Sequence, residues 1–189
     1  ELDTARLYYE ESLATSESIG NRWSIGVALN NLGALGIVTG EYATARQQLE
    51  EVLAFWREIG ERWGTTNTIH NLANVAREEG NFQEATDLYA ESLEGWLELE
   101  DRWGTASWLE DTGLLQLQLG KPQAALQLVG KAAALREEIG APRPPAYDET
   151  LAKRLQPAWE ALGQEAAAAA LTKGQFLELE EVIDLALEV

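Results

Sequence analysis

The sequence predicts an all-α protein built as a helical solenoid, and three observations predict it. Residues recur at a spacing of 40, with tryptophan at 23, 63 and 103, glycine at 40, 80 and 120, and alanine at 5, 45, 85 and 125. Apolar residues within a repeat fall at helical spacing, as Ala45, Leu49 and Leu53 do. The alternating apolar and polar runs that are typical of strands do not occur.

Each repeat divides into two helices because glycines separate its apolar segments, where a helix C-terminus favours a left-handed residue. Asn21 and Asp101 are good N-caps directly before an Arg-Trp pair. Pro122 falls in the first turn of a helix, where its missing N–H costs nothing. We expect helices over 2–18, 23–39, 42–58, 63–79, 82–98, 103–119 and 122–138.

The helix expected at 2–18 is the second helix of a pair whose first helix is missing. Its apolar stripe around Leu7, Tyr8 and Leu13 should therefore face an empty place. The resulting organisation is a solenoid over 1–140, in which this orphan helix precedes repeats at 21–60, 61–100 and 101–140.

The C-terminal part begins with a proline-rich linker over 141–146. A helix is expected from Asp148, kinked or broken near Pro157. Gly174 is expected to close the next helix, and a last helix should cover 178–188. Because the last repeat of a solenoid leaves an apolar face, residues 141–189 are interpreted as capping helices.

Charge and composition exclude several classes of function. Lys and Arg number 14 against 32 Asp and Glu, which gives a formal charge of −18. Such a chain repels phosphate backbones and anionic lipid surfaces, so neither nucleic acid nor a membrane is an expected partner. Without cysteine there is no disulfide or thiolate chemistry, which is compatible with the cytoplasmic location we expect. The chain starts at Glu1 and has no methionine, so it is expected to be cut from a longer protein.

Motifs for catalysis or for holding a cofactor are missing. Gly120-Lys121-Pro122 lacks the upstream glycine and the Ser or Thr of a phosphate-binding loop. His70 lies inside a helix, and pairing with Glu110 one repeat away makes only a weak metal site. We therefore expect no enzymatic activity, no metal and no cofactor.

The repeats resemble the tetratricopeptide family. Asn31-Leu32-Gly33 resembles the core of the first helix, and Gly40-Glu41-Tyr42 resembles the turn into the second. Ala45, Ala85 and Ala125 fit the small residue at which the paired helices cross. The period of 40 exceeds the usual period of about 34. HEAT-type repeats are the second alternative because their length is similar, but they lack this small-residue pattern.

A narrower resemblance covers the whole chain. Repeats of 40 residues that start with Arg-Trp-Gly are similar to those in large bacterial signalling ATPases of the STAND class, which often carry a LuxR-type domain. The resemblance implies a sensor or scaffold arm of a transcriptional or signalling regulator, in contact with the other domains of that parent protein. It does not imply that this segment hydrolyses ATP.

The resemblance also implies that the solenoid is right-handed and has a concave groove lined by the first helix of each pair. Amides suit a peptide backbone or a small polar effector, because they both donate and accept hydrogen bonds. The alternative is that the same residues only face water. The candidates for groove binding are Asn30, Asn31, Asn67, His70, Asn71, Asn74, Arg77, Ser107, Glu110 and Asp111.

Aromatic and apolar residues give two further hypotheses. Trp23, Trp63 and Trp103 are interpreted as core because they recur with the repeat, whereas Trp108 has no counterpart and is a candidate contact for a ligand, with core packing as the alternative. The second function hypothesis is self-association as a homodimer, in which the orphan helix buries Leu7, Tyr8 and Leu13 against another chain.

Overall fold

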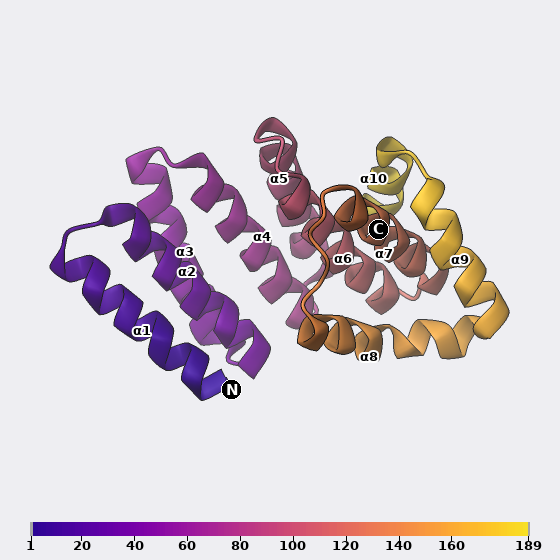
Figure 1. Cartoon of the computed structure of the whole chain (residues 1–189), viewed down its shortest axis with the longest axis horizontal. Coiled ribbons are helices and arrows are strands. Elements are labelled where there is room, and N and C mark those ends of the chain that lie inside the picture. The colour runs from indigo at the N-terminus through magenta and orange to yellow at the C-terminus, as the bar shows by residue number, and fades with distance from the viewer. Residues whose placement is uncertain (1, 189) are drawn as a thin grey trace. The chain divides into compact units, whose positions relative to one another are not determined.

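The computed structural model describes residues 2–188, which form ten helices and no strand (Figure 1). Each of the first seven helices begins and ends within one residue of its expected limits, because the glycine and cap positions mark the helix ends in the sequence. The helices are α1 (Leu2–Ser18), α2 (Arg22–Thr39), α3 (Tyr42–Ile59), α4 (Arg62–Glu78), α5 (Phe82–Glu98), α6 (Arg102–Gln118), α7 (Pro122–Glu138), α8 (Pro145–Leu162), α9 (Gln164–Phe176) and α10 (Leu179–Leu187).

One expectation for the C-terminal part is wrong, and another keeps only one of its alternatives. Helix α8 starts at Pro145 and continues through Pro157, so of the expected kink or break the break does not occur. Gly174 does not close its helix but lies within α9, which ends at Phe176. The reason for Gly174 is a close approach between two helices, described below.

The chain divides into two compact units, residues 1–95 (unit 1) and 96–189 (unit 2). Unit 1 contains α1 to α4 and α5 as far as Gly95, and unit 2 contains the end of α5 and all later helices. This division falls inside α5, so each unit is described by itself.

In unit 1, glycines allow the helices to pack closely. A Cβ built on Gly33 would lie 2.7 Å from the Leu49 side chain, and one on Gly36 would lie 3.0 Å from the Cβ of Ala45. These contacts join α2 to α3, the first and second helices of one pair. The fully buried Ala45 therefore has the predicted role of a small residue at the crossing.

The buried tryptophans differ from those that the sequence indicated. Trp23 and Trp103 are 51% and 53% exposed, so their expected burial is wrong. They lie at the start of a first helix, where the Trp103 ring contacts the Arg136 guanidinium at 5.5 Å. The fully buried tryptophans are instead Trp56 and Trp96 on second helices and Trp108 on the first helix α6.

In the core of unit 1, the ring of Trp56 occupies the space next to two glycines that have no side chain. A Cβ on either Gly26 of α2 or Gly64 of α4 would lie 2.3 Å from the ring of Trp56. In unit 2, a Cβ on Gly104 would lie 2.6 Å from the ring of Trp96 in the same way. Each indole thus fills the space that the missing Cβ atoms leave.

Unit 2 has its own core, in which the C-terminal helices cover the last pair. Leu151 and Leu155 of α8 and Ala167 of α9 pack with Leu126 and Val129 of α7. The closest approach is between α7 and α9. A Cβ on Gly174 would lie 2.0 Å from the Gln127 carbonyl oxygen, and one on Gly130 would lie 2.1 Å from that of Leu171.

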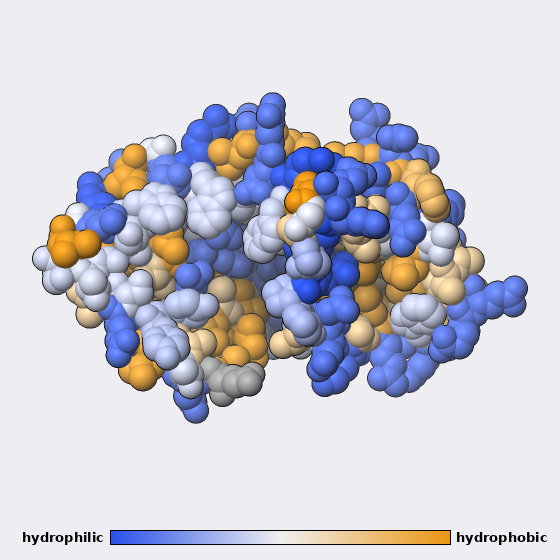
Figure 2. Space-filling model, viewed as in Figure 1, coloured by the Kyte–Doolittle hydropathy of each residue, from blue (hydrophilic) through white to orange (hydrophobic). Residues whose placement is uncertain are grey.

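The surface is mainly hydrophilic, as the charge of −18 predicts. In Figure 2, blue hydrophilic residues are spread over the visible face, with smaller orange apolar areas among them. Within residues 2–188, no helix has both the length and the apolar character that a membrane crossing needs.

Candidate binding surfaces

The residues predicted to line a groove lie on α2, α4 and α6, the first helices of the three pairs, and differ in their exposure. Half of them are buried in the interior and the other half are half-buried, so only the second group reaches the surface. The buried ones are Asn30, His70, Asn74, Arg77 and Glu110. The half-buried ones are Asn31, Asn67, Asn71, Ser107 and Asp111.

In unit 1, a polar contact holds the first helices of neighbouring pairs together. The Oδ1 atom of Asn30 on α2 accepts hydrogen bonds from Thr68 Oγ1 at 2.9 Å and from Asn71 Nδ2 at 3.3 Å, both on α4. Because Asn30 and Thr68 are buried, these bonds satisfy polar groups that would otherwise be costly to bury. The role of Asn30 visible in the structure is to position α2 against α4.

A second buried polar cluster connects α4 with α5 inside unit 1. The Tyr89 hydroxyl donates to Asn74 Oδ1 at 2.7 Å and accepts from Arg77 Nη1 at 3.1 Å. Arg77 also donates to Glu78 Oε1 at 2.9 Å. The His70 ring meets the Tyr89 ring edge-on at 5.8 Å. Tyr89 lies at the centre of this cluster. Its sequence position gave no sign of this, because an aromatic residue on a second helix is typical of ordinary core packing.

In unit 2, the fully buried Glu110 carboxylate of α6 is held by three donors. Its Oε1 accepts from Arg136 Nε at 2.6 Å and from Arg143 Nε at 2.7 Å. Its Oε2 accepts from Arg136 Nη2 at 3.0 Å and from the Tyr147 hydroxyl at 3.1 Å. Two arginines and a phenol therefore satisfy one buried charge.

The charges of this cluster shift the pKa values of its donors. Burial disfavours the charge on Arg136, but its hydrogen bonds and attraction to Glu110 outweigh this and raise its pKa. The pKa of Tyr147 is raised, first by desolvation and then by the negative charges of Asp111 and Glu110, beside which a phenolate is unfavourable. Tyr147 thus stays a neutral donor to Glu110.

The position that Glu110 occupies holds a different polar residue in each repeat, Asn30, His70 and Glu110 in turn. The 40-residue repeat shows that these three positions are equivalent, but it does not show which side chains surround them. Arg136, Arg143 and Tyr147 come from the end of α7, the following linker and α8, so no spacing within the repeat points to them. The sequence did hold one indication, because Arg136 precedes the proline-rich linker and Arg143 lies within it, in a very acidic chain.

The aromatic candidate Trp108 and the apolar candidates on α1 differ in their exposure to solvent. Trp108 is fully buried in the structure, which corresponds to the packing alternative for this residue. Leu7 and Tyr8 on α1 are 52% and 63% exposed, and Leu13 is half-buried. Part of the apolar stripe of α1 therefore faces solvent in this structure.

The side chains that could hold a metal ion together do not form a cluster in the described part of the chain. No group of three or more His, Cys, Asp and Glu side chains gathers in residues 2–188 as a metal site would need. His70 is involved with Tyr89, in unit 1, and Glu110 with arginines, in unit 2.

Comparison with known families agrees with the helix pairs, the crossing alanines and the turn glycines. The tetratricopeptide repeat model matches residues 24–98 and again 64–138, which together cover more than half of the chain. The chain belongs to the tetratricopeptide repeat family. Proteins of this family generally mediate protein–protein interactions, and the repeats typically act as non-catalytic scaffolds. A search among curated proteins finds no match to the sequence.

Proposed function

We propose that this chain is a non-catalytic scaffold segment that binds a protein or peptide through the first helices of its pairs. The observation that carries the proposal is the set of half-buried amides on α2 and α4 of unit 1, above all Asn31 and Asn67. Amide side chains can both donate to and accept from an extended peptide backbone. The buried bond between Asn30 and Thr68 keeps α2 and α4 side by side, which preorganises the two amides.

The wider setting that we propose is a cytoplasmic bacterial signalling or transcriptional regulator, of which this chain forms the sensing or scaffold arm. The support is the resemblance of the Arg-Trp-Gly starts and the 40-residue period to STAND-class arrays. In that setting the partner is a peptide segment, a small polar effector or another domain of the same protein.

The test begins by selecting, from a random library of displayed peptides, those that bind to the whole chain. The double variant Asn31→Ala/Asn67→Ala should weaken the selected peptides about tenfold, because two surface hydrogen bonds are lost. Neither side chain supports the buried contact of Asn30, so the fold should persist. Gln47→Ala, which removes an exposed amide from the second helix α3, is the matched control. Equal affinities for the double variant and the wild type would refute binding through the first helices.

Self-association is the second candidate function, and the exposure of Leu7 and Tyr8 favours it. A second copy would bury the apolar stripe that α1 leaves open. Sedimentation of the whole chain against Leu7→Glu/Tyr8→Ser tests it. A wild type that stays monomeric at the highest concentrations reached would refute it.

A further inference from the structure

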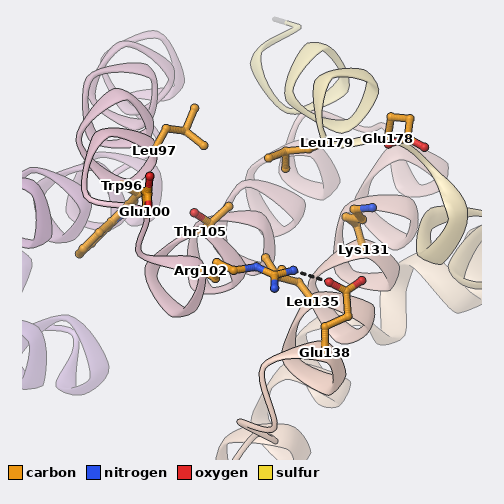
Figure 3. Close-up of a pocket in the computed structure, with 10 residues that line it drawn as sticks. All are labelled: Trp96, Leu97, Glu100, Arg102, Thr105, Lys131, Leu135, Glu138, Glu178 and Leu179. Carbon is orange, nitrogen blue, oxygen red and sulfur yellow. Dashed lines mark hydrogen bonds and ion pairs between the residues drawn. The ribbon is translucent and has the colours of Figure 1, made fainter.

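A cavity of about 210 Å³ opens in unit 2, between the end of α5, the start of α6, α7 and the start of α10 (Figure 3). It shares no residue with the first-helix amides of the proposed function. Ten residues line it: Trp96, Leu97, Glu100, Arg102, Thr105, Lys131, Leu135, Glu138, Glu178 and Leu179.

The interior of this cavity is apolar. Trp96 and Leu135 are buried and contribute apolar surface to it. Leu97 and Leu179 lie on opposite sides of its upper part in Figure 3, and Leu97 is 44% exposed. Leu97 and the half-buried Leu179 are thus accessible from outside, and the space suits one large apolar side chain.

Three of the lining residues break the 40-residue pattern. Leu97 stands where the preceding repeat has Arg57, and that arginine donates to Glu91 at 3.3 Å to join α3 with α5. Leu97 cannot form the equivalent ion pair, and neither can Lys131. The glutamates at the positions equivalent to Lys131 are Glu11, Glu51 and Glu91, and the glycines equivalent to Glu100 are Gly20, Gly60 and Gly140.

Glu100 carries a backbone cost that its counterparts avoid. Its φ of 52° lies in the left-handed region, and it is the one residue with positive φ other than glycine in residues 2–188. A side chain in this conformation costs about 1 kcal/mol relative to glycine. A carboxylate is therefore kept at the cavity mouth although glycine fits the backbone better.

The charges at the rim leave an excess of carboxylate. Arg102 is paired with Glu138, as the dashed line in Figure 3 shows, and Lys131 Nζ donates to the Leu177 carbonyl oxygen at 2.5 Å. In the count of charges at the rim, Arg102 is thus matched by Glu138 and Lys131 by Glu178, whose side chain also caps α10, so the carboxylate of Glu100 remains as the excess negative charge. A cationic group on a ligand fits this rim, and an anionic one is repelled.

We propose that this cavity binds a peptide segment that carries one large apolar side chain beside a lysine or arginine. The apolar side chain fills the space between Leu97 and Leu179, and the cationic group faces Glu100. The cavity thus selects a peptide by its apolar and cationic side chains, whereas the first-helix amides would bind the peptide backbone. The proposal therefore stands or falls independently of the proposed function.

The test is an NMR titration of the whole chain that follows the methyl groups of Leu97 and Leu179. The probes are the blocked peptides acetyl-Ala-Lys-Leu-Lys-Ala-amide, acetyl-Ala-Glu-Leu-Glu-Ala-amide and acetyl-Ala-Lys-Ala-Lys-Ala-amide. The first should shift both methyl groups and bind about tenfold more tightly than either of the others.

Two variants locate the binding. Leu97→Arg restores the residue of the preceding repeat and should weaken the Lys-Leu-Lys peptide about tenfold. Glu100→Gly removes the charge while it relaxes the backbone, and should weaken it about threefold. Glu165→Gln, an exposed carboxylate on α9, is the control and should leave the affinity unchanged.

Three outcomes would overturn the proposal. They are no shift of either methyl group at millimolar peptide, equal affinity for the Glu-Leu-Glu peptide, and unchanged affinity in both Leu97→Arg and Glu100→Gly. Because Glu100→Gly relaxes the backbone, weaker binding by this variant cannot be assigned to misfolding.

Discussion

Arg136 makes two hydrogen bonds to Glu110, from Nε to Oε1 at 2.6 Å and from Nη2 to Oε2 at 3.0 Å, in the interior of unit 2. This bidentate contact connects α6 with α7, the two helices of the last pair. Arg143 and Tyr147 extend it to the linker and α8. One carboxylate thus joins the last repeat to the segment that caps it.

Glu110→Gln should therefore be strongly destabilising. It leaves Arg136 and Arg143 in the interior without their counter-charge, and we expect a loss of about 3 kcal/mol in the free energy of unfolding. Urea denaturation followed by circular dichroism measures it. Glu138→Gln breaks the Arg102 pair, whose side chains are both more than half exposed, and should cost less than about 1 kcal/mol. Equal losses for the two variants would contradict a special role for Glu110.

Tyr147 should make the stability of unit 2 sensitive to alkali. Its pKa is raised in the folded state, so the unfolded chain loses this proton first as the pH rises above about 10. The contribution of the neutral phenol is complete below that pH and is lost as the pH climbs towards the folded-state pKa. Tyr147→Phe should flatten the fall in stability above pH 10, measured by urea unfolding at pH 8 to 11. Tyr8→Phe, at an exposed site on α1, should keep the wild-type profile.

Gly174→Ala should weaken the packing of α9 on α7. The new Cβ would lie 2.0 Å from the Gln127 carbonyl oxygen, so the helices must separate, at a cost of about 1–3 kcal/mol. Thermal unfolding gives the change in Tm. Gln175→Ala, at the exposed neighbouring position, should change stability by less than about 0.5 kcal/mol. An unchanged Tm for Gly174→Ala would mean that the close crossing contributes nothing.

Glu100→Gly should stabilise the protein. It removes a side chain from a residue with a φ of 52°, which should raise the free energy of unfolding by about 1 kcal/mol. The reciprocal change Gly140→Ala, at the equivalent position with a φ of 65°, should lower it by a similar amount. Calorimetry of both variants checks this, and a lower Tm for Glu100→Gly would show that its carboxylate stabilises the fold.

Sequence reasoning located the first seven helices because recurrent glycines and caps mark their ends. It failed to assign faces at the start of the first helices, where Trp23 and Trp103 recur and yet point outward. Recurrence shows that a position matters, and it does not show on which side of the helix the position lies. Gly174 has two possible uses in a helix, and only the distance to Gln127 distinguishes a close crossing from a stop signal.

The candidate sites were predictable to different degrees for a similar reason. Leu7 and Tyr8 are 52% and 63% exposed, and the position of their helix ahead of the first complete pair indicated an open apolar stripe there. The burial of Asn30, His70 and Glu110 depends on partners that lie between 19 and 41 residues away. These partners do not follow from the period of the repeat, so a polar residue on a first helix could not be assigned to interior or groove.

The three lining residues that break the repeat also bear on how this protein could be redesigned. Consensus design replaces each position by the residue that most repeats share, and it commonly raises stability. Here it would place glycine at 100 and glutamate at 131 and would remove Leu97, because these three are minority residues at their positions. The resulting chain should be more stable and yet lack the distinct rim of the cavity, so a designer who values that surface must exempt these positions.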